Sequence, residues 1–130
     1  MESSGLLEIY TDGASRGNPG NAGIGIVIKK SGQIVWQLSK NIGETTNNVA
    51  EYYAVIYALQ QALILHAGHV LLRTDSELVC RQCQGVYQVK HPEIRRLFDQ
   101  VEHLRHGFHS FRIEHIPRGQ NHEADRLSKK

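Results

Sequence analysis

The residues of this chain best suited to chemistry are four carboxylates on separate segments, namely Asp12, Glu51, Asp75 and Asp125. Two of them follow a threonine at the end of a largely apolar run, and the other two lie in segments with helical spacing. Four gathered carboxylates repel one another and raise one another's pKa values unless a cation neutralises them. Oxygen ligands without Cys or His at matching spacing suit Mg²⁺ or Mn²⁺ better than zinc. If the fold brings the four together, the pattern predicts a divalent-metal site.

Taken one at a time, the same carboxylates have ordinary structural explanations. Asp12 suits an Asp-Gly turn, and Asp75 suits the cap of a following helix. Glu51 suits the first turn of a helix, and Asp125 could pair with Lys129 one turn later. The metal-site interpretation therefore depends on whether the elements gather all four at one place.

The apolar periodicity predicts the elements that must position these residues. Alternating or short continuous apolar runs predict five strands: Leu6–Thr11, Ala22–Lys30, Ile34–Leu38, Val70–Thr74 and Phe108–Ile116. Spacings of three and four, with stop and start signals, predict four helices: 49–66, Ser76–Gln84, Pro92–His106 and Asn121–Ser128. The Gly- and Pro-rich segment 13–20 is predicted to be a turn. The order is βββαβααβα.

This order predicts an α/β fold with one five-stranded mixed sheet and helices on both faces. The first three strands form an antiparallel meander, and the strands that follow helices run parallel to the first strand with right-handed crossovers. The expected strand order is 3-2-1-4-5. Asp12 and Asp75 would then meet outside the carboxyl ends of neighbouring parallel strands, where open α/β sheets bind ligands.

Four ordered strings give the chain a resemblance to ribonuclease H, type 1: Thr11–Ser15 with Gly17–Gly20, Thr46–Glu51, Thr74–Ser76 and Asn121–Asp125. The resemblance covers nearly the whole chain and implies a ribonuclease-H-like sheet. It further implies a metal-dependent endoribonuclease that hydrolyses the RNA strand of RNA–DNA hybrids, leaving 5′-phosphate and 3′-hydroxyl ends. The implied cofactor is a pair of Mg²⁺ or Mn²⁺ ions held by the four carboxylates, with Asp12 as the bridging ligand.

The resemblance also implies which residues contact the hybrid. The positions carried over are Gly13, Ser15, Asn18, Thr46, Asn47 and Asn48. Amide side chains suit this task because they both donate and accept hydrogen bonds at 2′-hydroxyls and base edges. Helix capping is the competing explanation for the two adjacent asparagines, and it is stronger for Asn48 than for Asn47.

The chain departs from the family pattern in two places. Some family members insert a basic helix after the third carboxylate. Here the only basic residues in the segment from Gln84 to Glu93 are Lys90 and one histidine. His115 has the spacing from Asp125 expected for the family's mobile catalytic histidine, but it lies at the end of a predicted strand and the loop after it is short. Arg118 is the favoured catalytic residue in that loop, with an electrostatic role, and His115 is expected to contribute to packing.

Two further patterns are interpreted as structural. Cys80 and Cys83 form a C-x-x-C pair, but no second Cys pair completes a zinc site, so both are expected to be small apolar residues of a helix. His103, His106 and His109 recur every third residue around Gly107, which breaks a shared helix face, so they are expected to lie in solvent.

Size and composition set the remaining expectations. A chain of 130 residues with 40% hydrophobic and 22% charged residues is typical of one globular domain, predicted to span 1–130. No apolar run approaches the length of a membrane span and no signal peptide is visible, so a cytoplasmic, monomeric protein is expected. The alternative functions are a non-cleaving hybrid-binding module of the same fold and a polynucleotidyl transferase-like domain.

Overall fold

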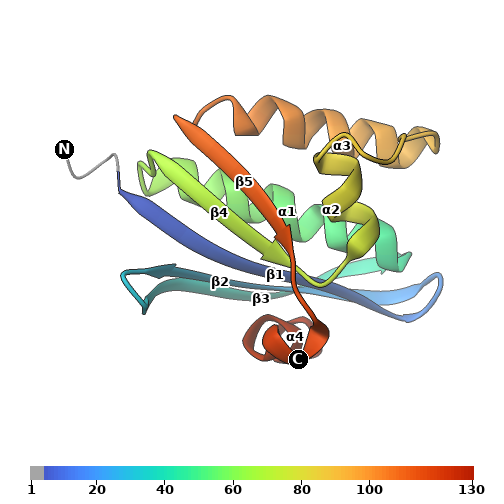
Figure 1. Cartoon of the computed structure of the whole chain (residues 1–130). Helices are drawn as coiled ribbons and strands as arrows, with labels where there is room; N and C mark the ends of the chain where they lie inside the picture. The colour runs from blue at the N-terminus through green and yellow to red at the C-terminus, as the bar shows by residue number, and fades with distance from the viewer. Residues whose placement is uncertain (1–4) are drawn as a thin grey trace.

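The computed structural model describes residues 5–130, and five strands and four α-helices follow one another there as expected (Figure 1). The strands are β1 (Leu6–Gly17), β2 (Gly20–Lys30), β3 (Gln33–Thr45), β4 (His69–Thr74) and β5 (Ser110–His115). The helices are α1 (Asn47–Ile64), α2 (Glu77–Cys83), α3 (Pro92–Arg105) and α4 (His122–Ser128), with a short 3-10 helix, η2 (Arg118–Gln120), before α4. The segment between α2 and α3 contains no helix.

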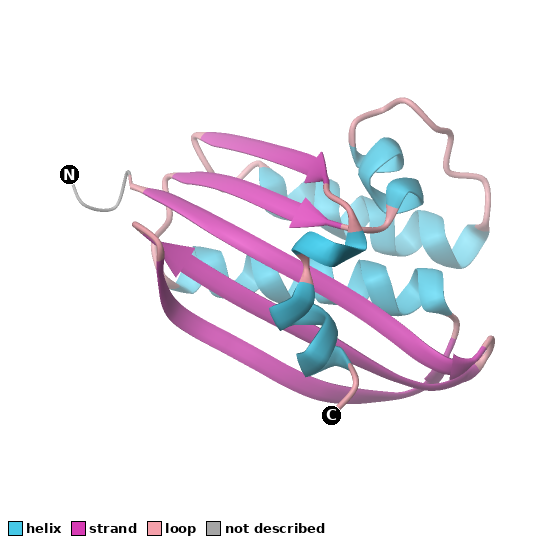
Figure 2. Ribbon diagram, turned by 60° about the horizontal axis from the view of Figure 1, so that its bottom comes forward, coloured by secondary structure: helices cyan, strands magenta, loops and turns pink. Residues whose placement is uncertain are grey.

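The strands form one mixed sheet in the order β3-β2-β1-β4-β5. β1, β2 and β3 pair antiparallel, and β4 and β5 extend the sheet parallel to β1. Figures 1 and 2 show α1 to α3 on one face of the sheet and α4 crossing the other. The predicted fold class, strand order and two-sided helix cover are confirmed.

The core lies between the sheet and α1, with α3 packed beside α1. The alternating isoleucines of β2, at positions 24, 26 and 28, are fully buried beneath α1. Because successive side chains of a strand point to opposite faces, the odd-numbered positions of β2 face α4, and positions 23 and 25 among them are glycine. The predicted alternation of β2 is therefore confirmed. One face of the strand packs into the apolar core under α1, and the other face lets the backbone of α4 come close.

The ends of β1 and β3 differ most from the predictions. β1 continues to Gly17 and β3 continues to Thr45, so most of the segment predicted as a turn is strand. The register from Asp12 opposite Gly25 to Gly17 opposite Gly20 shows why, because small residues on both strands let them stay paired. The hairpin then needs only Asn18 and Pro19 as its turn. Asp12 consequently lies inside a strand and not at its end, although β4 leaves the sheet beside it at Thr74.

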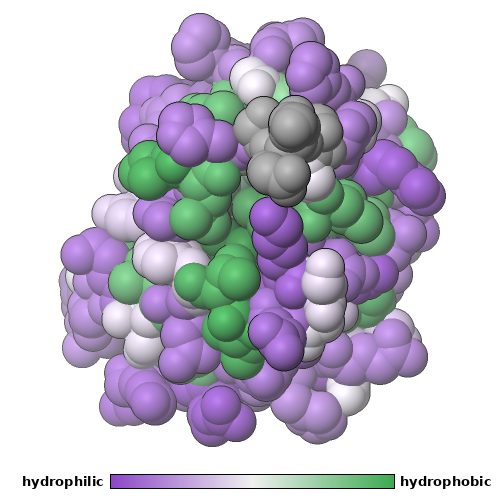
Figure 3. Space-filling view, turned by 90° about the vertical axis from the view of Figure 1, so that its left-hand side faces the viewer, coloured by the Kyte–Doolittle hydropathy of each residue, from purple (hydrophilic) through white to green (hydrophobic). Residues whose placement is uncertain are grey.

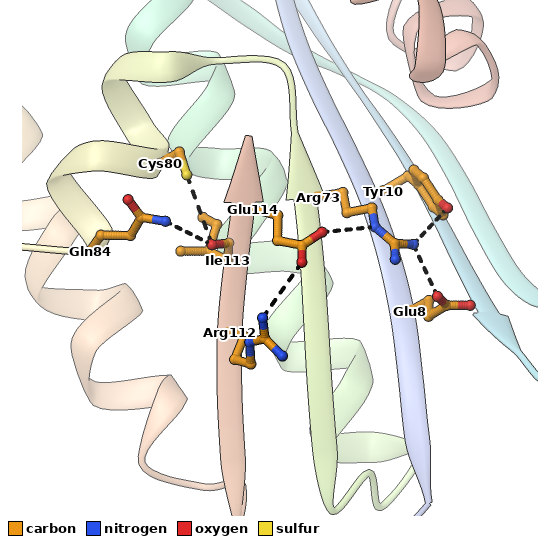
Figure 4. Close-up of polar contacts among 8 residues, drawn as sticks. All are labelled: Glu8, Tyr10, Arg73, Cys80, Gln84, Arg112, Ile113 and Glu114. Carbon is orange, nitrogen blue, oxygen red and sulfur yellow. Dashed lines mark hydrogen bonds and ion pairs between the residues drawn. The ribbon is translucent and has the colours of Figure 1, made fainter. Parts of the chain in front are cut away.

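The outer face of β1, β4 and β5 carries a polar network centred on Arg73 (Figure 4). The Arg73 guanidinium donates to Glu8 at 3.0 Å, to the Tyr10 hydroxyl at 2.8 Å and to Glu114 at 3.3 Å. These residues come from three neighbouring strands, so the network bridges the parallel part of the sheet on the side without apolar cover. Charge-assisted bonds of this kind specify geometry as well as adding modest stability.

The sheet is also tied to α2. Gln84, at the C-cap of α2, donates to the Ile113 carbonyl of β5 at 3.0 Å, and the Cys80 thiol lies 3.9 Å from the same oxygen (Figure 4). Both cysteines are buried and free, as the helix interpretation predicts. Burial raises the pKa of the Cys83 thiol to about 12, so this thiol is a poor nucleophile and a poor metal ligand.

The end of the molecule where β1 begins carries an apolar patch surrounded by hydrophilic residues (Figure 3). Exposed apolar side chains of β1, β3 and the C-terminal end of α1 contribute Leu6, Ile34, Val35, Ile64 and Leu65. Among the described residues, none of the helices has both the length and the apolarity needed to cross a bilayer.

α4 packs directly onto the backbone of β2. A Cβ atom at Gly25 would lie 2.0 Å from the Ala124 carbonyl oxygen, and one at Gly23 would lie 2.3 Å from that of Ser128. The Ser39 hydroxyl of β3 donates to the Leu127 carbonyl at 2.6 Å and fixes the helix laterally. Glycine at positions 23 and 25 is therefore the condition for the close approach of α4.

Gly25→Ala is expected to push α4 off the sheet and to lower the free energy of unfolding by roughly 1–3 kcal/mol, the usual cost of overpacking. Urea unfolding followed by circular dichroism measures this change. Gly119→Ala is the matched control, because a Cβ there meets no atom within 4 Å. Equal stability of the two variants would show that α4 is not held by backbone contact.

Candidate active site

Three of the four predicted carboxylates meet beside the end of β4. Oxygen atoms of Asp12 in β1, Glu51 in α1 and Asp75 after β4 all lie within 4.8 Å of one another. Asp12 is 4% exposed and Glu51 is 9% exposed, so two of the three are largely removed from water. The topology therefore gathers acids that are 24 to 63 residues apart in the sequence, at the place predicted for them.

Glu51 reaches β1 because α1 lies against the backbone of Gly13. A Cβ atom at Gly13 would lie 2.4 Å from the carbonyl carbon of Ala50, so only glycine permits this contact. The Gly13 amide donates to Glu51 Oε1 at 3.1 Å, and this bond holds the carboxylate next to Asp12.

Asp75 is available to the site because its neighbours supply the helix cap. The Ser76 hydroxyl accepts from the Val79 amide, and the Thr74 hydroxyl accepts from the Ser76 amide. The capping explanation for Asp75 is therefore wrong. Its Oδ2 instead accepts from the Asn121 amide at 3.2 Å, and the same Asn121 nitrogen donates to the Thr11 carbonyl at 2.9 Å.

Asp125 adjoins Asp12 but stands outside the three-acid cluster. Its carboxylate pairs with Lys129 at 3.1 Å, which is the i,i+4 pair considered as its structural explanation. The Ser128 hydroxyl, three residues after Asp125 in α4, lies 2.8 Å from Asp12 Oδ2 and 2.7 Å from the Asp125 carbonyl. α4 therefore contributes a carboxylate and a hydroxyl to the environment of Asp12.

Ser128 and Asn121 are site residues that sequence reasoning did not identify as such. Both are buried, and each makes a hydrogen bond to one of the clustered carboxylates. The signal for Ser128 was its i+3 spacing from Asp125, which places both on one helix face. Asn121 was read as the start of the last helix, but its side chain makes no cap and faces the acids instead.

Burial and mutual repulsion shift the titration of the cluster. Desolvation, followed by the charge of Asp75, raises the pKa of Asp12 from 3.8 to about 7, while the Ser128 hydrogen bond opposes the shift. Desolvation also raises the pKa of Glu51 well above its usual range, with the charges of Asp12 and Asp75 adding to it. The Gly13 amide and the charge of Arg118 act in the opposite direction. Such a cluster is poorly stable alone near neutral pH and fits a divalent cation.

The predicted substrate-binding residues surround the start of α1. Thr46 caps this helix, because its hydroxyl accepts from the Val49 amide, so the capping explanation for Asn48 is wrong. Asn47 Oδ1 accepts from the Ser15 amide at 2.8 Å, and Asn18 Oδ1 accepts from the Asn47 amide at 3.0 Å. The Ser15 hydroxyl donates to the Gly17 carbonyl. These bonds join the β1–β2 hairpin to α1 next to Gly13, and the asparagines remain exposed.

The loop before α4 carries Arg118 in η2, exposed to solvent. Its charge lowers the pKa of Glu51, which relates it to the cluster electrostatically. His115 lies opposite Thr74 in the register of β4 and β5, immediately before Asp75, and its side chain is exposed. The expected packing role of His115 is therefore wrong: it shares the strand face of buried Ile113, but it is the last residue of β5 and its side chain is exposed.

The three histidines of the repeated series lie at the surface. His103, His106 and His109 are all exposed, as predicted. Across residues 5–130, the cluster of possible metal ligands found contains only the three acids and no histidine or cysteine. The chemistry available at this site is therefore that of hard oxygen ligands.

The raised pKa of Asp12 predicts an inverse dependence of stability on pH in metal-free protein. Between about pH 4 and 7 the folded protein retains a proton that the unfolded chain has released, so stability falls as pH rises. Asp12→Asn should remove this loss and stabilise the metal-free fold above pH 7 by on the order of 2–4 kcal/mol. Urea unfolding in a chelator at pH 4.5 and 7.5 measures the difference. A variant less stable than wild type at pH 7.5 would contradict the shift.

Comparisons with known proteins agree with this fold and site. The family model described as reverse transcriptase-like matches residues 10–130. Ribonuclease HI of Halobacterium salinarum is 41% identical over 125 residues, which cover 95% of this chain and 63% of that protein. The bifunctional protein Rv2228c of Mycobacterium tuberculosis is 40% identical over 122 residues, covering 92% of this chain and 34% of that protein. The chain thus spans between a third and two thirds of the length of these curated relatives.

Solved structures extend the similarity to three dimensions. The crystal structure of RNase H1 from Halobacterium salinarum superimposes with a TM-score of 0.94 at 41% identity, covering 96% of each chain. LC11-RNase H1, solved in complex with RNA/DNA hybrid, superimposes with a TM-score of 0.89 at 44% identity, covering 95% of this chain and 94% of that chain. The chain matches the family model, shares the fold of the solved structures and is similar in sequence over almost all of its own length. It therefore belongs to the ribonuclease H family.

Proposed function

We propose that the chain is a metal-dependent endoribonuclease that hydrolyses the RNA strand of RNA–DNA hybrids and leaves 5′-phosphate and 3′-hydroxyl ends. The observation that carries the proposal is the cluster of Asp12, Glu51 and Asp75 next to an exposed polar surface on the hairpin and α1. Three gathered acids facing a polyanion are useful only if a cation lies between them. The relative solved with RNA/DNA hybrid supports the substrate class.

The proposed cofactor is Mg²⁺ or Mn²⁺, with two ions per site. Asp12, Glu51 and Asp75 would hold them, and Asp125 would join the set by releasing Lys129. When bound, divalent ions activate a water molecule and stabilise the leaving oxygen of an in-line displacement. The buried carboxylates with raised pKa values support this ligand set, because a cation offsets both their desolvation and their repulsion.

The chain's own groups would orient the ligands and the substrate. Ser128 would hold Asp12 from the α4 side, and Asn121 would hold Asp75 against β1. The charge of Arg118 is suited to a phosphate near the cluster, where negative charge increases in the transition state. Because guanidinium does not release its proton near neutral pH, Arg118 would act by electrostatic attraction and not as an acid or base.

The proposed contacts to the hybrid lie on the same side as the α1 N-terminus. Asn18, Asn47 and Asn48 present exposed amides, and Ser15 and Gly13 line the strand between them and Asp12. Thr46, the helix cap, would contact a DNA phosphate. The hydrogen bonds among Ser15, Asn18 and Asn47 support the proposal, because a pre-organised polar surface loses less conformational entropy on binding.

That the protein is a monomer, that it is cytoplasmic and that residues 1–130 form a single domain stay predictions.

Asp12→Asn is expected to reduce cleavage of a labelled RNA–DNA hybrid by at least about 10³-fold at saturating Mg²⁺, because it removes a shared ligand charge. Hybrid binding and folding should persist. Gel-based cleavage and fluorescence anisotropy measure the two properties. Substantial cleavage by purified Asp12→Asn would refute the metal-dependent mechanism.

The same cleavage assay distinguishes the proposed enzyme from its alternatives. Wild-type protein that binds hybrid with Mg²⁺ or Mn²⁺ but leaves it intact would instead be a non-cleaving binding module. Strand joining without hydrolysis would indicate the transferase-like alternative, which no observation on this chain favours.

Arg118→Ala is expected to lower the turnover number by about 10- to 100-fold with a smaller effect on the Michaelis constant, since its charge acts mainly on the transition state. His115→Ala is the matched comparison. With its side chain in solvent, this variant should keep the wild-type melting temperature. If His115→Ala alone lost turnover and changed the pH–rate profile, a proton-transfer role at His115 would replace the one assigned to Arg118.

A further inference from the structure

A polar cavity of about 340 Å³ lies beside the proposed active site, on the face of the sheet that α4 covers. Its lining includes three cationic side chains, Arg16, Lys129 and Lys130, and two amides, Asn21 and Asn41. None of its lining side chains is a carboxylate. A hollow with this composition is suited to an oxyanion and unsuited to a metal ion or an apolar ligand.

The fold builds this cavity from the same strand that carries Asp12. Because strand side chains alternate, Asp12, Ala14 and Arg16 project from one face of β1. Gly23, against which the Ser128 carbonyl packs, and the small side chain of Ala14 also line the cavity. Ser128 forms a wall of the cavity while its hydroxyl contacts Asp12. The cavity and the carboxylate cluster are therefore neighbours on one surface.

Arg16 and Lys130 are the cations of this cavity that make no ion pair among the described residues, and Arg16 is the one fixed on a strand. Lys129 already pairs with Asp125, whereas within residues 5–130 no acidic side chain lies within ion-pair distance of Arg16. The Arg16 side chain is exposed, and Asn21 lies directly opposite it across the hairpin. Arginine on a rigid strand, next to an amide donor, presents the forked geometry that phosphate groups accept.

We propose that this cavity binds a backbone phosphate of the strand that is cut, beyond the scissile bond. Arg16 lies about 13 Å along β1 from Asp12, at roughly 3.3 Å per residue, which matches a phosphate a short distance along the same strand and not the scissile one. This inference rests on the proposed function, because it assigns an additional subsite to the same substrate. It gives the chain a cationic contact that the missing basic helix does not supply.

Equilibrium binding tests the contact. In an Asp12→Asn background, where the hybrid stays intact, Arg16→Ala should weaken hybrid binding roughly five- to tenfold near 0.1 M salt and reduce the salt slope by about 0.9, as expected for one lost phosphate contact. Arg16→Lys should restore most of the affinity, because the charge returns. Arg96→Ala, which removes an exposed charge on α3, is the matched control and should have no effect. An unchanged salt slope in Arg16→Ala would overturn the proposal.

A chemical double-mutant cycle locates the phosphate. Single methylphosphonate linkages, each at a 2′-deoxynucleotide, are placed along the RNA strand, and a second series is placed along the DNA strand. At one or two adjacent RNA-strand positions the neutral linkage should weaken binding when Arg16 is present and have no further effect in Arg16→Ala. Coupling to the DNA strand alone, or no coupling, would overturn the assignment. If wild type fails to cut hybrid, the proposed function fails, whereas cutting without coupling removes only this subsite.

Discussion

The site depends on one constraint, which is that two helices touch the backbone of the β1–β2 hairpin from opposite faces. α1 contacts β1 at Gly13, and α4 contacts β2 at Gly23 and Gly25. At each contact a Cβ atom would lie closer than van der Waals distance to helix backbone. Because the helices come this close, short side chains suffice to reach the centre of the sheet. Glu51 arrives from one side and the Ser128 hydroxyl from the other, and both meet β1 beside Asp12.

The same close approach makes the site electrostatically costly. It buries Asp12 and Glu51, and desolvation is the largest cause of the raised pKa of each. Neutral or positively charged groups offset part of that cost: the Gly13 amide and the Arg118 charge for Glu51, and the Ser128 hydroxyl for Asp12. The remaining repulsion destabilises the cluster relative to a cation-bound form. The metal-free fold is therefore less stable because of the residues for which chemistry is proposed.

Much of this could be predicted from sequence, for identifiable reasons. The alternating isoleucines of β2, the helical spacing in α1 and the ordered acidic strings are local patterns, and they led to the strand order and to the meeting of Asp12, Glu51 and Asp75. What failed depended on cross-strand or tertiary contacts. The continuation of β1 to Gly17 depends on pairing with β2, which a Gly-rich segment does not reveal by itself. The roles of Asn121 and Ser128 depend on which neighbours α4 meets, and propensity does not report that.

The alternation of β1 has a consequence for how this family member can change over evolution. Asp12 and Arg16 point toward α4, whereas Gly13 and Ser15 point toward α1, so the strand separates two sets of contacts by odd and even position. A point substitution alters one contact. An insertion or deletion of a single residue between Tyr10 and Gly17 would exchange the two sets, sending the carboxylate toward α1 and the glycine away from it. This stretch should therefore tolerate changes of residue type at its exposed positions while keeping its length constant.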